Sequence, residues 1–231
     1  MKRLLALLAL LLAGCGGAGD DRVTVYAAAS LTEAFQELAP EARFNFAGSD
    51  ELATQIREGA RPDVYAAASA RYPEELHEEG LAGTPRVFAT NRLVLIVPAA
   101  NPVSIRRLED VAEPGVKLVL GAAGVPVGDY AREALAGAGL DAALQNVVSF
   151  EEDVKGVVGK VALGEADAGM VYATDAAAAG ADVTAIELTS EVEIRYPVVV
   201  VRPGEQADDF VELLFSERAR RILREAGFGL P

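Results

Sequence analysis

Two serines stand where an apolar segment ends and a helical pattern begins. Ser30 follows the apolar residues 23–28, and Ser49 follows the alternating residues 43–46 after a short turn. Ser30 and Glu33 have the spacing of a capping box, in which a hydroxyl and a carboxylate bind free N–H groups at a helix start. Helix starts carry unpaired donors and a partial positive charge, so these positions can bind an anion. Either serine taken separately is more simply explained as a helix cap.

Histidine and cysteine, which often act in catalysis or bind metals, are scarce in this chain. The chain has one histidine, His77, and one cysteine, Cys15, so metal sites made of several histidines or cysteines are excluded by count. A Ser-His-Asp or Cys-His enzyme would have to use His77, which lies in the acidic helical segment 74–79 and is interpreted as a solvated residue. The glycine-rich residues 121–128 are not followed by the Lys-Ser/Thr pair of a P-loop. We therefore expect a binding protein without a cofactor.

Composition narrows the class of protein and its partners. The chain has 231 residues, of which 51% are hydrophobic, which is enough for a large core in one or two domains. Its formal net charge is -14, so the folded body is a poor partner for nucleic acid or for an anionic membrane surface.

The N-terminal residues resemble a targeting segment. Lys2 and Arg3 precede the apolar residues 4–12, which are too few to span a bilayer and indicate a signal peptide over residues 1–14. Cys15 directly follows Leu-Ala-Gly, which resembles the lipobox of bacterial lipoproteins. We expect Cys15 to be lipidated, with residues 15–21 as a tether, although an ordinary secretory signal is the alternative. The mature protein is then extracytoplasmic and membrane-anchored, in the periplasm if the organism has an outer membrane.

Strand-like and helix-like segments alternate along the rest of the chain, which predicts an α/β fold with mostly parallel sheets. The predicted strands are residues 23–28, 43–46, 63–67, 92–98, 117–120, 147–150, 168–172 and 196–201. The predicted helices are residues 31–38, 51–58, 72–79, 105–111, 130–136, 154–163, 175–179 and 208–225.

The two longest apolar strands bracket a self-contained α/β block, which indicates two lobes. We expect residues 22–96 and 198–231 to form the first lobe and residues 97–197 to form the second. Ligands of such sheets bind beyond the carboxyl ends of the strands, which here places the site in the cleft between the lobes.

Six short motifs occur in an order and at a spacing that resemble the molybdate-binding proteins of bacterial ABC transporters, which have a type II periplasmic-binding fold. Each motif is weakly specific, but the ordered set is strongly so. The motifs are residues 28–32, 46–49, 125–131, 152–155, 169–172 and 196–198. The resemblance covers residues 23–229 and implies capture of molybdate, and of tungstate, for delivery to an inner-membrane ABC permease by a monomeric binding protein.

The resemblance also implies the ligand-binding residues. Hydroxyl groups are expected from Ser30, Ser49 and Tyr172, and backbone N–H groups from Val127 and Val154 at helix starts. Only the resemblance selects the two valines, and Tyr172 taken separately is more simply a core residue. Where the family often has a run of serines, this chain has Asp50 after Ser49; we expect its carboxylate to face outward and serve the helix start.

Such residues match a ligand that only accepts hydrogen bonds. Molybdate and tungstate are fully deprotonated dianions at neutral pH, whereas phosphate still carries a proton and is better matched by a site that includes an acceptor. Two alternatives remain open: a relative that binds sulfate or another tetrahedral oxyanion, and an enzyme on a similar two-lobed frame.

Overall fold

A computed structural model describes residues 22–189 and 192–231. The predicted signal peptide (residues 1–14), the predicted lipidation site Cys15 and the predicted tether (residues 15–21) lie outside the described residues. None of the helices in the described part of the chain is long and apolar enough to cross a membrane.

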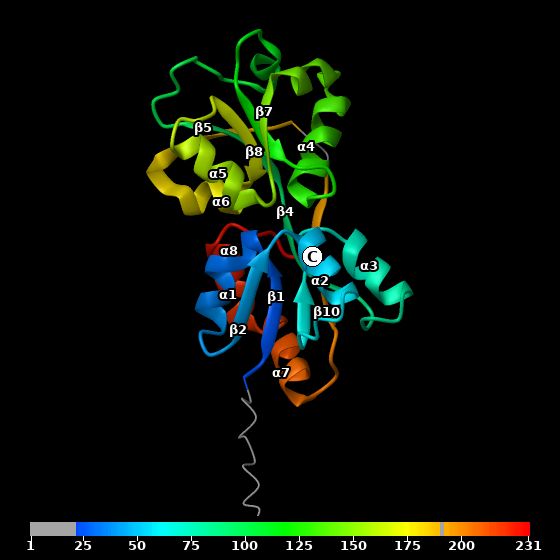
Figure 1. Cartoon of the computed structure of the whole chain (residues 1–231). Coiled ribbons are helices and arrows are strands. Elements are labelled where there is room, and N and C mark those ends of the chain that lie inside the picture. The colour runs from blue at the N-terminus through cyan, green and yellow to red at the C-terminus, as the bar shows by residue number, and fades with distance from the viewer. Residues whose placement is uncertain (1–21, 190–191) are drawn as a thin grey trace, which may run out of the picture.

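The described strands form two sheets of five, each flanked by helices (Figure 1). In spatial order, the first sheet contains β2 (Arg43–Ala47), β1 (Thr24–Ala28), β3 (Val64–Ala66), β10 (Ile194–Val200) and β4 (Arg86–Asn91). The second contains β7 (Val147–Glu151), β6 (Leu118–Gly121), β8 (Ala168–Tyr172), β5 (Leu93–Pro98) and β9 (Val183–Glu187). This confirms the predicted α/β class.

Both sheets are mixed rather than mostly parallel. In the first sheet β1 pairs in parallel with β2 and β3, while β10 runs antiparallel to β3 and β4. In the second sheet β6 pairs in parallel with β7 and β8, while β5 runs antiparallel to β8 and β9. The antiparallel strands β5 and β10 are the two long apolar strands that the sequence places at the lobe boundaries.

The strand pairing places the lobe boundaries a few residues before the predicted ones, which follow residues 96 and 197. Only Arg92 lies between β4 and β5, and the chain changes sheets there, so β5 belongs wholly to the second sheet. Likewise β10 belongs to the first sheet from Ile194 onward. We call the first sheet with its helices (residues 22–91 and 194–231) the first lobe, and the second sheet with its helices (residues 93–189) the second lobe.

The helices mostly follow the predicted segments, with two corrections. They are α1 (Thr32–Leu38), α2 (Ser49–Arg57), α3 (Arg71–Glu78), α4 (Pro126–Gly137), α5 (Val154–Ala162), α6 (Ala173–Ala179), α7 (Glu205–Leu214) and α8 (Glu217–Glu225). The predicted helix 208–225 is two helices, because Ser216 caps α8 by accepting a hydrogen bond from the Ala219 N–H at 3.2 Å. The predicted helix 105–111 is instead a short 3-10 helix, Leu108–Ala112.

The carboxyl ends of three strands meet between the two lobes. Strands β1, β2 and β8 end at Ala28, Ala47 and Tyr172, and all three residues line one pocket. The sheets therefore bring together short loops and helix starts from both lobes, as expected for strands whose carboxyl ends face a common cleft.

Candidate functional site

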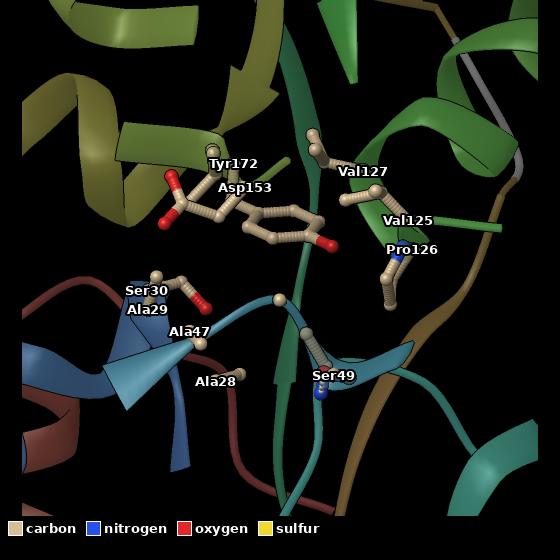
Figure 2. A pocket seen from close by; sticks show the side chains of 13 residues that line it. Ala28, Ala29, Ser30, Ala47, Ser49, Val125, Pro126, Val127, Asp153 and Tyr172 are labelled. Carbon is tan, nitrogen blue, oxygen red and sulfur yellow. Dashed lines mark hydrogen bonds between the residues drawn. The ribbon is translucent and has the colours of Figure 1, made fainter. Parts of the chain in front are cut away.

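The pocket between the lobes contains all five predicted ligand-binding residues (Figure 2). The pocket is small, with a cavity volume of about 20 Å³. The first lobe contributes Ala28, Ala29, Ser30, Ala47, Gly48, Ser49 and Ala68. The second lobe contributes Val125, Pro126, Val127, Asp153, Val154 and Tyr172.

Ser30 does not form the predicted capping box. It lies in a 3-10 turn (Ala29–Leu31) before α1, and neither this turn nor α1 has a side-chain cap. Its Oγ instead lies 2.9 Å from the hydroxyl of Tyr196, on β10 of the same lobe. The carboxylate of Glu33 accepts hydrogen bonds from Lys155 Nζ at 2.8 and 2.9 Å. Long-range partners have thus replaced the local ones, and Ser30 lines the pocket with only 4% of its surface exposed.

Ser49 is the first residue of α2 and is 1% exposed. Its Oγ accepts a hydrogen bond from the Ala68 N–H at 3.0 Å, and its carbonyl accepts one from the Tyr65 hydroxyl at 2.7 Å. Because the Ser49 oxygen already accepts, the proton of its hydroxyl is available for a ligand.

Glycine precedes Ser49 because the lobes approach each other closely there. A Cβ atom on Gly48 would lie 2.5 Å from the carbonyl oxygen of Glu152 in the second lobe. Any larger residue would therefore hold the lobes apart at the pocket.

The two valines lie at helix starts, as predicted. Val127 is the second residue of α4, after Pro126, and Val154 is the first residue of α5. The first N–H groups of a helix have no partner within the helix, so both helices can direct backbone donors at the pocket. Asp153 lines the pocket but caps α5, since its Oδ1 accepts a hydrogen bond from the Gly156 N–H at 2.9 Å.

Tyr172 ends β8 and enters the pocket from the second lobe. The residue is 2% exposed, and its hydroxyl is buried with no hydrogen-bond partner among the described residues. Burial raises the pKa of the Tyr172 hydroxyl well above its ordinary value, so it keeps its proton and remains a donor. A buried hydroxyl without a partner is costly, and a ligand that accepts a hydrogen bond would remove that cost.

Asp50 lies outside this pocket and lines a neighbouring cavity. Burial raises the pKa of its carboxyl group, while hydrogen bonds from the backbone N–H groups of Asp50 and Glu51 lower it. Its Oδ1 is buried without a hydrogen-bond partner in the described structure. The carboxylate thus interacts with the start of α2, as expected, but it is partly buried rather than directed outward.

Sequence reasoning missed several polar residues around the pocket. Asp175 on α6 is fully buried, with Lys155 Nζ at 3.3 Å from its Oδ1. Asn91 at the end of β4 donates hydrogen bonds to Thr174 and Tyr196. Their local sequence carries no signal of these roles, because each partner is distant in the chain. No group of three or more His, Cys, Asp or Glu side chains suited to a metal occurs among the described residues.

Comparison with known proteins finds relatives over most of the chain. The family described as "Bacterial extracellular solute-binding protein" matches residues 23–229. The molybdate-binding protein ModA of Mycobacterium tuberculosis (strain ATCC 25618 / H37Rv) is 36% identical over 229 residues, which cover 92% of this chain and 86% of that protein. The protein of the same name from Haemophilus influenzae is 36% identical over 242 residues, which cover 95% of each chain.

A solved structure shares the fold. The periplasmic molybdate-binding protein of Azotobacter vinelandii superposes with a TM-score of 0.79, covering 91% of this chain and 100% of that chain, at 21% identity. The two-lobed arrangement is therefore the type II periplasmic-binding fold that the sequence motifs indicate.

Proposed function

Because this chain belongs to the family of bacterial extracellular solute-binding proteins, we propose that it captures molybdate outside the cytoplasm and delivers it to an ABC importer. The relatives named as molybdate-binding proteins support this choice of ligand. We propose the same site for tungstate, which has the same shape and charge as molybdate.

The observation that carries the proposal is the convergence of donors from both lobes on one pocket. Ser30 and Ser49 face Tyr172 across it, with the starts of α4 and α5 beside them (Figure 2). Among the described residues, Asp153 alone brings a carboxylate to the pocket lining, and it accepts a hydrogen bond from the start of α5. An anion that only accepts hydrogen bonds fits this mostly donor set better than a protonated anion, which needs an acceptor for its own proton.

The hydrogen bonds are strong enough to hold such a ligand. About five bonds to a charged group contribute roughly 8–15 kcal/mol at 1.5–3 kcal/mol each. Association costs at least about 4 kcal/mol. The remainder is consistent with dissociation constants from weak to roughly nanomolar. Because donors come from both lobes, the ligand stabilises the closed arrangement that a transporter can recognise.

A titration panel tests the ligand. Calorimetry on the Cys15→Ser chain, which cannot be lipidated at that position, would use molybdate, tungstate, sulfate and phosphate. We expect strong binding of molybdate and tungstate, weaker binding of the smaller sulfate, and weak binding of phosphate. Strong binding of sulfate with negligible heat from molybdate would favour the alternative, a sulfate-binding relative.

Substitution of the serines tests the site. Ser30→Ala and Ser49→Ala each remove one donor, so we expect each to weaken molybdate binding by roughly 10- to 100-fold. Ser149→Ala is the matched control, because Ser149 lies on β7 and bonds to Glu151 at 2.6 Å, away from the pocket. Wild-type affinity in both pocket variants would show that these residues do not bind the ligand.

We further propose that residues 1–14 are a signal peptide and that Cys15 carries a lipid which anchors a monomer to the membrane. The lipobox-like sequence before Cys15 supports this proposal. Mass spectrometry of the membrane fraction should find acylated Cys15 at the N-terminus of the mature protein. The Cys15→Ser variant should appear in the soluble fraction, and an unmodified Cys15 in the wild type would contradict the anchor.

A further inference from the structure

Asn91, at the end of β4, has a side-chain amide whose orientation is fixed by its own neighbour. Its Oδ1 accepts a hydrogen bond from the Arg92 N–H at 2.9 Å. Its Nδ2 therefore faces two hydroxyl oxygens, that of Thr174 at 3.0 Å and that of Tyr196 at 3.3 Å. The amide group has two N–H donors, so each hydroxyl oxygen receives one.

The hydrogen bond from Asn91 determines the direction of the hydrogen bond between Tyr196 and Ser30. The residue is fully buried, and burial raises the pKa of its hydroxyl well above the ordinary value, so the proton stays on the oxygen. Since that oxygen accepts from Asn91, its own proton needs another acceptor, and the Ser30 Oγ lies 2.9 Å away. If Ser30 donated to Tyr196 instead, the Tyr196 proton would be buried without an acceptor among the described residues, which is unfavourable.

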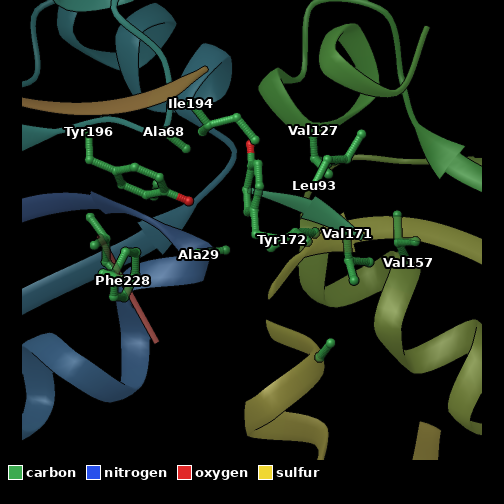
Figure 3. Packing of buried hydrophobic residues seen from close by; sticks show 14 of the residues in the cluster. Ala29, Ala68, Leu93, Val127, Val157, Val171, Tyr172, Ile194, Tyr196 and Phe228 are labelled. Atoms are coloured by element: carbon green, nitrogen blue, oxygen red, sulfur yellow. The ribbon is translucent and has the colours of Figure 1, made fainter. Parts of the chain in front are cut away.

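The ring of Tyr196 packs against two other aromatic rings. Its ring makes edge contacts with the rings of Tyr172 and Phe228, with centroids 5.9 Å and 5.3 Å apart (Figure 3). Replacing Tyr196 by phenylalanine keeps these contacts and removes the hydroxyl, with its hydrogen bonds to Ser30 and Asn91.

We propose that Asn91 and Tyr196, neither of which lines the pocket, are positioning residues that orient the Ser30 hydroxyl so that it donates to the ligand. This relay of hydrogen bonds runs from Asn91 Nδ2 through the Tyr196 hydroxyl to Ser30 Oγ, and it leaves the Ser30 proton for the bound anion. The inference rests on the proposed function and deepens it. The relay points the Ser30 proton at the ligand, and so favours a fully deprotonated oxyanion over one that carries a proton.

The first test is Tyr196→Phe in the otherwise intact chain. Losing one neutral hydrogen bond that orients Ser30 should raise the dissociation constant for molybdate by about 3- to 10-fold. Because Ser30 can then turn and accept a proton, competition by phosphate near neutral pH should improve relative to molybdate. Tyr26→Phe on β1 is the matched control, since Tyr26 is half-buried and does not line the pocket.

A double-mutant cycle separates this role from a merely structural one. In the Ser30→Ala background, Tyr196→Phe should cause no further loss of molybdate affinity, because the relay acts only through the Ser30 hydroxyl. A loss by the same factor in both backgrounds would overturn the inference. So would wild-type affinity in Tyr196→Phe.

A second variant, Asn91→Asp, reverses the direction of these hydrogen bonds. Asn91→Asp replaces the two donors by acceptors, so Tyr196 would donate to the new carboxylate and Ser30 would turn its proton toward Tyr196. We expect a loss larger than that of Tyr196→Phe, about 10- to 100-fold, in protein whose thermal melt confirms folding. Undiminished molybdate binding in folded Asn91→Asp would overturn the inference only. Absence of molybdate binding in the wild type would overturn the proposed function as well.

Discussion

Tyr172 brings to the pocket a hydroxyl that the protein itself leaves without a hydrogen-bond partner in the described structure. Tyr172→Phe removes that hydroxyl and keeps the ring. We expect molybdate binding to weaken by roughly 10- to 100-fold, because a bond to a charged ligand is lost. The ligand-free melting temperature should stay the same or rise, because an unsatisfied buried group is gone.

Calorimetry would measure the affinity for molybdate, and thermal melts without ligand would measure the melting temperature. Tyr26→Phe again serves as the control for the substitution itself. A fall in the ligand-free melting temperature together with unchanged affinity would show that the Tyr172 hydroxyl has a structural role and not a binding role.

Asp175 is the buried charge next to the pocket whose state depends on pH. Burial raises its pKa to about 7, although the nearby ammonium group of Lys155 lowers it. Burial also lowers the pKa of Lys155, but attraction to Asp175 and Glu33 raises it more, so Lys155 stays charged. The folded protein therefore holds the Asp175 proton more tightly than the unfolded chain does. Its contribution to stability is present below about pH 4 and is lost as the pH rises to about 7.

The Asp175→Asn variant lacks this titration. Between pH 5 and pH 8, the free energy of unfolding of the wild type should fall relative to the variant by roughly 2–3 kcal/mol. Urea unfolding at the two pH values measures this, with the exposed Asp209→Asn as control. Parallel changes in wild type and Asp175→Asn would show that Asp175 does not titrate in this range.

At the scale of elements, the start of α4 reaches the pocket because two glycines let it pack closely on the end of β6. A Cβ atom on Gly128 would lie 2.3 Å from the Gly121 carbonyl oxygen and 2.4 Å from that of Ala122. Gly128→Ala should therefore push the helix start away, costing about 1–3 kcal/mol of stability and weakening molybdate binding.

The same helix supplies the control for this prediction. A Cβ atom on Gly137, the last residue of α4, would meet nothing within 4 Å. Gly137→Ala should stabilise the protein by about 0.5–1 kcal/mol through helix propensity and leave binding unchanged. Chemical unfolding and calorimetry on both variants check the pair, and equal stability of the two would contradict the close packing of α4 on β6.

At the scale of the whole molecule, contacts on both sides of the pocket hold the lobes together. On one side Lys155 of the second lobe binds Glu33 of the first at 2.8 Å. On the other, the Tyr72 hydroxyl donates to the Gly124 carbonyl. The ion pair is partly exposed and contributes little, so the Tyr72 hydrogen bond is the better target for shifting the balance between open and closed forms.

Tyr72→Phe should lower the population of the closed form without touching the pocket, which Tyr72 does not line. We expect the dissociation constant for molybdate to rise by about 2- to 10-fold. Small-angle scattering should give a larger radius of gyration than the wild type without ligand and the same radius at saturation. An unchanged radius and affinity would show that this bond does not stabilise closure.

The sequence by itself determined the α/β class, most helices, and the five residues that the structure brings into one pocket. The patterns of strands and helices repeat within a few residues, and the order of the motifs is a property of the sequence. Both can therefore be predicted without knowledge of tertiary contacts. The half-exposed strands β4 and β9 were missed because their apolar pattern is weak.

Only the tertiary structure decided which sheet holds β5 and where the polar groups point. Ser30 and Glu33 have the right spacing for a local cap, yet Ser30 bonds with Tyr196, 166 positions away, and Glu33 with Lys155, 122 positions away. Likewise, nothing near Asp175 in the chain predicts its complete burial. A local pattern gives the partners that a side chain can have, but folding decides among them, because a buried polar group takes the partner that the packed lobes place within reach.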